Sequence, residues 1–482
     1  MSKNIKGRVL SGMMWTFAEK MGSQGISFIV SVVLARLLMP SQYGLIAMLS
    51  VVMAICNTFI DCGFGVALVQ KKNSDEKDFN TVLYSSTFVG FVLYIIMYFS
   101  APLVSSFFNQ EELTKVMRIY TLSFLWSGYN SVLVSYISKH MLFKKMFRRT
   151  LIANSLSGVA GITAAYMGFG VWALVIQNFT AAIIGIITLQ LSIDWIPKLQ
   201  FSWSRAKKLL SFSSKVMTAN LIGTGFNELK GLLIGRLYTP ADLAFYNKGG
   251  SLPSLVANNI NTSIGNVLFP AMSQYSDNRD KVKEITSRSI RISSYVLFFG
   301  LTILILISEP LVRLLFTEKW VACVPYMQMV CLQRMLEIIS TANLQAMKAV
   351  GEGNVIVKLE LYKKPIFLLL TVIGANISVF ALAVTLPLYS FIANIINMWP
   401  NIKILNYRLH DQVRDLAPST ILSIIMAIVL FPVNFLPMSD ILKIVSITIF
   451  GVIIYIGVSI IAKVESLNYI FNTIKTYRNK KR

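Results

Sequence analysis

Residues 441–462, ILKIVSITIFGVIIYIGVSIIA, form an apolar stretch that contains a single charged side chain, Lys443. A helix of about 20 predominantly apolar residues crosses the hydrocarbon core of a bilayer, so this stretch predicts a membrane-spanning helix. Similar stretches recur along the chain. Of its 482 residues, 55% are hydrophobic and 14% are charged, whereas soluble chains have about 25% charged residues. The composition excludes a cytosolic enzyme, a disordered chain and a secreted disulfide scaffold, and predicts an all-α polytopic membrane protein.

We expect about 14 transmembrane helices along the chain. Their approximate bounds are 10–38, 42–66, 81–107, 114–138, 150–167, 171–192, 210–238, 241–270, 289–308, 321–347, 355–375, 377–402, 417–434 and 441–462. The first stretch is too long for the apolar region of a signal peptide and carries Glu19 and Lys20 near its middle. It is therefore predicted to be the first spanning helix, not a cleaved leader.

The net charge of +23 would suggest nucleic-acid binding in a soluble protein. In a membrane protein, lysine and arginine collect in the cytoplasmic loops. Alternate connectors here are basic, for example around Lys71, Lys144 and Lys207, while the turns near Pro40 and Gly168 carry no Lys or Arg. This alternation predicts an even number of spans with both termini in the cytoplasm, and no nucleic-acid partner.

The chain resembles itself when it is shifted by 200 residues. The shift places Arg36 on Arg236, Pro40 on Pro240 and Gly65 on Gly265. It predicts a duplication with an N-terminal lobe at 1–200 (helices 1–6), a C-terminal lobe at 201–405 (helices 7–12), and helices 13 and 14 with a basic cytoplasmic tail at 406–482. Six spans separate equivalent helices, so the repeats run parallel. Transporters built from repeats place the substrate at the repeat interface, and two lobes imply alternating access.

Polar residues inside the predicted spans indicate where a substrate would bind, because ionisable groups there are costly unless they face a cavity or a partner. We predict a cationic and polar cavity lined by Lys20, Gln24, Lys215, Asn220, Asn227, Lys230, Lys248, Asn258 and Arg334. Such a lining suits phosphate groups and sugar hydroxyls. Coupling to an ion gradient would need a titratable carboxylate, and the candidates, which the sequence does not rank, are Glu19, Asp61, Glu228 and Glu337.

The sequence contains no motif for catalysis or nucleotide binding. A Walker loop, an HExxH motif and a dinucleotide fingerprint are all absent. Only two histidines occur, His140 and His410, both in basic loops. We therefore expect a protein that is not an enzyme and that needs no cofactor or metal.

Five motifs resemble a known transporter family. They are RLLMPSQYGLIAM (36–48), DCGFGVALVQKK (61–72), GFGVWALV (168–175), VLFPAMSQYSD (267–277) and FTEKWVACVPYMQM (316–329). The chain is similar to the polysaccharide transporter family of the multidrug/oligosaccharidyl-lipid/polysaccharide exporter superfamily, within its colanic-acid and teichuronic-acid exporter branch. The resemblance implies two six-helix lobes like those of the multidrug exporters, followed by two trailing helices.

The resemblance also implies a function. A flippase would move an undecaprenyl-diphosphate-linked oligosaccharide across the bacterial plasma (inner) membrane for O-antigen, capsule or exopolysaccharide synthesis. Its partners would be the lipid-linked oligosaccharide, membrane lipids and a polysaccharide polymerase or chain-length machinery, and a monomer is expected. Family members share a cationic cavity without an invariant motif, so the cavity residues remain an inference from the pattern. The sequence has mainly lysine at those positions, whereas arginine would favour bidentate binding of a diphosphate.

Three alternatives remain open from the sequence. A cation-coupled multidrug exporter of the same superfamily would need an acidic pocket, whereas the intramembrane charge here is mainly basic. A flippase for a lipid II-type peptidoglycan precursor would differ in cargo. A polymerase or ligase would carry a large outer loop, which this chain lacks.

Overall fold

The computed structural model describes residues 2–61, 64–71, 74–469 and 471–472, and no β-strand occurs among them. These residues form seventeen α-helices and three short 3-10 helices. Helices α3, α5 and α12 have nine residues or fewer, and the other fourteen have sixteen or more. Each of the predicted spanning stretches overlaps one of these long helices; the stretch 441–462, for example, lies on α17 (Asp440–Ile461). The basic tail beyond Asn472 lies outside the described residues.

Seven helices of the described chain are long and apolar enough to cross a membrane, judged by length and composition. They are α2, α4, α8, α11, α15, α16 and α17. The protein is therefore a multi-pass, all-helical membrane protein. The larger count of about 14 spans stays a prediction, because the remaining long helices carry more polar and charged side chains.

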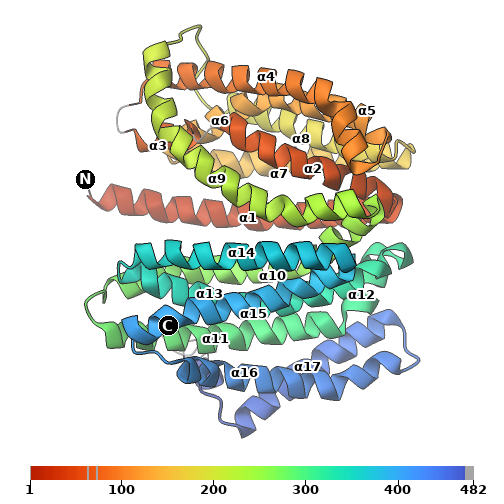
Figure 1. The fold of residues 1–482 in the computed structure, drawn as a ribbon, viewed down its shortest axis with the longest axis vertical. Helices are drawn as coiled ribbons and strands as arrows, with labels where there is room; N and C mark the ends of the chain where they lie inside the picture. Colours follow the sequence, from red (N-terminus) through yellow and green to blue (C-terminus); the bar gives the residue numbers. More distant parts are fainter. Residues whose placement is uncertain (1, 62–63, 72–73, 470, 473–482) are drawn as a thin grey trace. The chain divides into compact units, whose positions relative to one another are not determined.

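The structure divides into two compact units, residues 1–244 and 245–482. The first unit contains α1 (Ser2–Leu37), α2 (Pro40–Asp61), α3 (Phe64–Gln70), α4 (Glu76–Phe108), α5 (Glu112–Tyr120), α6 (Phe124–Lys139), α7 (Phe143–Tyr166), α8 (Val171–Gln190) and α9 (Trp203–Leu237). Helix α7 packs between α1 and α8, α4 packs on α6, and α9 packs on α2, α3 and α4 (Figure 1). One apolar core includes Phe64, Phe79, Leu133 and Trp195.

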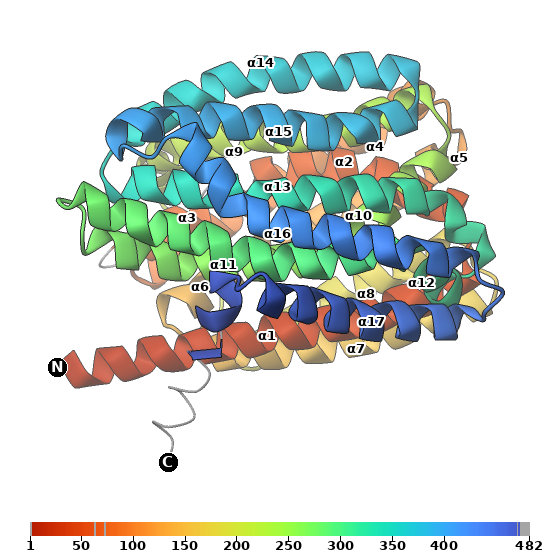
Figure 2. The ribbon, with the colours of Figure 1, turned by 90° about the horizontal axis from the view of Figure 1, so that it is seen from below.

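The second unit contains α10 (Pro240–Ser273), which begins just before the division, and the helices that follow it. These are α11 (Arg279–Leu306), α12 (Ser308–Phe316), α13 (Val324–Ala349), α14 (Gly353–Ile377), α15 (Val379–Ile404), α16 (Leu409–Leu430) and α17. Helix α13 packs on α11 and α15, and α16 packs on α11 and α17 (Figure 2). Tyr295, Met426 and Tyr455 belong to the core that joins α11 to α16 and α17.

The two halves of the chain share several local features at positions that the 200-residue shift relates, and the duplication itself stays a prediction. Pro40 and Pro240 are each the first residue of a long helix, α2 and α10. In both turns a side chain two positions after the proline caps the helix start: Gln42 accepts from the Met39 N–H at 3.0 Å, and Asp242 accepts from the Thr239 N–H at 3.0 Å. A nine-residue helix and a 3-10 turn also precede both α6 and α13.

Helix α9 packs with the first unit, which ends at residue 244. The sequence predicts instead that the second lobe begins at residue 201. Packing contacts define compact units and do not define which helices move together during transport. The lobe boundaries at 200 and 405 therefore stay predictions.

Candidate functional site

The first unit contains a polar pocket of about 1020 Å³ between α2, α3, α6 and α9. Its polar lining residues are Thr58, Asp61, Gln70, Asn130, Ser131, Ser135, Ser138, Asn220, Thr224 and Asn227. The helical period explains this arrangement, because residues three and four apart share one face of a helix. Ser131, Ser135 and Ser138 follow that spacing on α6, and Asn220, Thr224 and Asn227 follow it on α9.

The chemistry of this pocket is that of amides, hydroxyls and one carboxylate. Asp61 is the last residue of α2 and is the charged residue among the described ones that line the pocket. The hydroxyls of Thr58 and Thr224 approach to 3.4 Å across the gap between α2 and α9. Amide and hydroxyl groups can exchange hydrogen bonds with sugar hydroxyls, and a carboxylate with neighbouring oxygens can hold a proton or a cation. The pocket thus brings together three predicted residues, Asp61, Asn220 and Asn227.

The predicted cations of the first unit lie outside this pocket. Lys20 on α1 and Lys215 on α9 have exposed side chains, whereas Lys230, further along α9, is 8% exposed. Gln24 on α1 is half-buried. A common cationic lining made with groups of the second unit stays a prediction.

The predicted cations of the second unit have partners within it. The ammonium of Lys248 on α10 is buried 4.2 Å from the ring centre of Phe316, a cation–π contact. Arg334 on α13 forms an ion pair with Glu337 at 2.6 Å and donates to Ser254 Oγ on α10 at 3.1 Å. A predicted phosphate-binding cation and a predicted coupling carboxylate therefore neutralise each other. Asn258 on α10 is exposed.

Two further carboxylates were predicted to couple transport to an ion gradient. Glu19 on α1 accepts a hydrogen bond from Thr150 Oγ1 on α7 at 2.8 Å. Glu228 on α9 is half-buried. Of the four candidate carboxylates, Asp61 is the one that lines the large first-unit pocket.

Comparison with known families decides the classification of the chain. Residues 33–325, more than half of the sequence, match the family model described as "Polysaccharide biosynthesis protein". The chain belongs to this family.

The chain has curated relatives whose names agree with this family. It is 23% identical to the succinoglycan biosynthesis transport protein ExoT of Rhizobium meliloti (strain 1021), over 71% of this chain and 69% of that protein. It is 22% identical to the teichuronic acid biosynthesis protein TuaB of Bacillus subtilis (strain 168), over 73% of each. It is 21% identical to the lipopolysaccharide biosynthesis protein WzxC of Escherichia coli (strain K12), over 78% of this chain and 77% of that protein.

Solved structures share the fold of this chain. The lipid II flippase MurJ in an inward closed conformation matches 98% of this chain and 100% of its own, with a TM-score of 0.74 at 13% identity. A MATE-family multidrug transporter in an inward-facing conformation matches 79% of this chain and 94% of its own, with a TM-score of 0.59 at 14% identity. The predicted fold class and family are confirmed.

Arg149 is a site residue that the sequence pattern does not reveal, because it belongs to a basic stretch directly before an apolar run. It lies on α7 and lines a second first-unit pocket of about 320 Å³. Its Nη2 donates to Asn130 Oδ1 on α6 at 2.8 Å. Asn130 lines this pocket and the larger one, so it links Arg149 to the pocket that contains Asp61.

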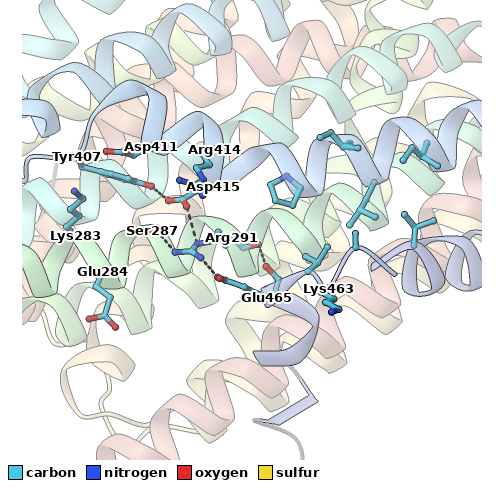
Figure 3. Close-up of a pocket in the computed structure, with 18 of the residues that line it drawn as sticks. Lys283, Glu284, Ser287, Arg291, Tyr407, Asp411, Arg414, Asp415, Lys463 and Glu465 are labelled. Atoms are coloured by element: carbon cyan, nitrogen blue, oxygen red, sulfur yellow. Dashed lines mark hydrogen bonds and ion pairs between the residues drawn. The ribbon is translucent and has the colours of Figure 1, made fainter. Parts of the chain in front are cut away.

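A charged pocket of about 920 Å³ in the second unit was also missed, since its residues are spread from 280 to 466 (Figure 3). Arg291 on α11 pairs with Asp415 on α16 at 3.1 Å and with Glu465, which follows α17. Tyr407 donates to Asp415, and burial together with this carboxylate raises the pKa of the Tyr407 hydroxyl. Because Arg291 joins three segments, this network ties the two C-terminal helices to α11.

Proposed function

We propose that this protein moves an undecaprenyl-diphosphate-linked oligosaccharide from the cytoplasmic to the outer leaflet of the bacterial plasma membrane, for synthesis of a surface polysaccharide. The family match, the similarity to the transport protein ExoT and the fold shared with MurJ support this proposal. The observation that carries it is the first-unit pocket, a cavity of about 1020 Å³ that is lined by amides and hydroxyls in a multi-pass membrane protein.

The physical need for such a protein comes from desolvation. Each sugar hydroxyl costs about 2–7 kcal/mol to bury without a hydrogen-bond partner, so an oligosaccharide does not cross a bilayer unaided at a useful rate. The pocket supplies partners such as Asn220 and Asn227. In our proposal the headgroup enters this polar region while the polyprenyl chain stays in lipid, and two lobes alternate access between the two sides.

We propose Asp61 as the carboxylate that couples transport to an ion gradient. It lines the same pocket as the two predicted amides, whereas Glu337 is already paired with Arg334. The roles of Lys20, Lys215, Lys230 and the other predicted cations stay proposals. Both termini are proposed to be cytoplasmic, and the protein is proposed to act as a monomer alongside a polymerase or chain-length machinery.

Depletion of the protein in its own host tests the function. We expect lipid-linked repeat units to accumulate in the inner leaflet and surface polysaccharide to fall. Raised drug sensitivity without this accumulation would favour the cation-coupled drug exporter, and accumulation of a peptidoglycan precursor would favour the lipid II-type flippase. A polymerase would instead leave single repeat units on the outer leaflet.

Variants test the individual residues in the same host. Asp61→Asn should abolish the dependence of transport on the ion gradient. Normal surface polysaccharide in both Lys20→Ala and Lys20→Glu would remove Lys20 from the site.

A further inference from the structure

The second unit contains a polar pocket at the position equivalent to the first-unit pocket. It has a volume of about 550 Å³ and lies between α10 and α13. The 200-residue shift that relates Pro40 to Pro240 places Asp61, Gly65 and Val69 of the first pocket on Asn261, Gly265 and Phe269, which all line the second.

The opposite walls of the two pockets correspond as well. A shift of 210 residues takes Ser131, Ser135 and Ser138 on α6 to Thr341, Gln345 and Lys348 on α13. In each unit the glycine faces the middle residue of this triplet. A Cβ atom on Gly65 would lie 2.7 Å from Ser135 Oγ, and a Cβ atom on Gly265 would lie 3.4 Å from Gln345 Nε2. The same two helix faces therefore meet at the same glycine in both units, which identifies one duplicated pocket.

The two copies of this pocket differ in charge. Asp61 gives the first pocket a carboxylate, and its equivalent in the second pocket is the neutral Asn261. Ser138 of the first pocket is replaced by Lys348, whose side chain is exposed. No acidic residue lines the second pocket in the part of the chain that the structure describes. The second copy is thus cationic where the first is anionic.

The second pocket also has an unfilled acceptor. Asn261 Oδ1 is buried and has no hydrogen-bond partner among the described residues. A buried acceptor without a donor is costly, so it favours a ligand that donates a hydrogen bond. Thr341 and Gln345 add a hydroxyl and an amide to the lining. A ligand for this site would combine an oxyanion for Lys348 with a hydroxyl for Asn261.

We infer that the duplicated pocket has diverged in charge, so that the second-unit copy binds a sugar phosphate, with Lys348 Nζ donating to the phosphate and Asn261 Oδ1 accepting from a sugar hydroxyl. This inference rests on the proposed function, because a sugar phosphate is the part of a lipid-linked oligosaccharide that such a site would recognise. The first copy keeps Asp61 and does not bind oxyanions.

Ligand-induced stabilisation of the purified full-length protein in detergent tests this inference, because a ligand that binds the folded state raises the unfolding midpoint. The probes are glucose 1-phosphate, glucose and inorganic phosphate at constant ionic strength. We expect glucose 1-phosphate to raise the midpoint most, since it engages both groups. Lys348→Ser restores the residue type of Ser138 and should weaken the apparent affinity by at least about tenfold, the effect of losing a charge-assisted hydrogen bond.

Two further variants sharpen the test. Asn261→Asp restores the residue type of Asp61 and should also weaken the response, because its carboxylate would pair with Lys348 and repel phosphate. The matched control is Lys403→Ser, which removes an exposed lysine of α15 outside the pocket and should leave the response unchanged. No response in the unaltered protein, or an equal response in Lys348→Ser, overturns the inference. Normal sugar-phosphate binding in a protein that fails to flip lipid-linked oligosaccharide in vesicles would count against the proposed function alone.

Discussion

At the scale of single residues, the guanidinium of Arg149 packs against Gly185 of α8. A Cβ atom on Gly185 would come within 3.0 Å of Arg149 Nε and 3.1 Å of Nη2. Gly185→Ala should therefore displace the guanidinium from Asn130 and lower the free energy of unfolding by about 1–3 kcal/mol, the usual cost of overpacking. Thermal unfolding in detergent measures this loss. The control is Gly457→Ala on α17, where a Cβ atom would have no other atom within 4 Å, so this variant should lose no stability. Equal unfolding midpoints for the two variants would contradict the prediction.

The contribution of Asp75 to the stability of the folded protein depends on pH. It caps α4 and pairs with Arg205, and this guanidinium holds the pKa of the Asp75 carboxyl well below its usual range. Because the pKa is lowered in the folded state, the pair stabilises the protein above the unfolded pKa of about 3.9, and the stabilisation is lost as pH falls through the folded value. Asp75→Asn keeps a capping side chain but should cost about 0.2–1 kcal/mol at pH 7.

The unfolding midpoints of the unaltered protein and Asp75→Asn, measured from pH 7 downward, should converge in acid. Asp277→Asn, at an exposed position before α11, is the control and should show no such convergence. A difference that grows as the pH falls would reverse the sign and contradict the prediction.

At the scale of elements, buried amides join α13, α15 and α16. Asn401 Nδ2 donates to Asn343 Oδ1 at 2.6 Å, and Asn343 Nδ2 donates to Gln412 Oε1 at 3.0 Å. Such contacts hold helices together where lipid gives no hydrophobic driving force. Asn401→Ala should cost about 1–3 kcal/mol, because it leaves a buried acceptor unpaired. The control is Asn376→Ala, which removes an exposed amide that is hydrogen-bonded within α14 and should change the unfolding midpoint little. An equal loss of stability in both variants would contradict a stabilising role for the buried amides.

The elements themselves were largely predictable from the sequence, and their contacts were not. Apolar length alone located helices such as α17, and the spacing of Asn220 and Asn227 identified the polar face of α9. Arg149 was missed because a cation beside an apolar run resembles the end of a loop. The network of Arg291, Asp415 and Glu465 was missed because proximity between distant segments depends on packing, which hydrophobic periodicity does not encode.

At the scale of the whole molecule, the predicted topology places the turn after α1 outside and the turn after α10 in the cytoplasm. Met39 and Tyr275 are exposed in these turns. In a chain whose four cysteines are replaced, Met39→Cys should react with an impermeant maleimide in intact cells, and Tyr275→Cys should react only after permeabilisation. Labelling of both from the same side would exclude the predicted alternation of basic loops.

The matching caps at Met39–Gln42 and Thr239–Asp242 have a consequence for the history of this protein. The predicted parallel duplication implies a half-length ancestor that would have assembled with a second copy of itself, so that one gene specified both halves and any substitution appeared twice. Fusion of the two copies into one chain would have ended that constraint. Each half could then have acquired mutations independently, which would have given an asymmetric carrier that kept the shared architecture.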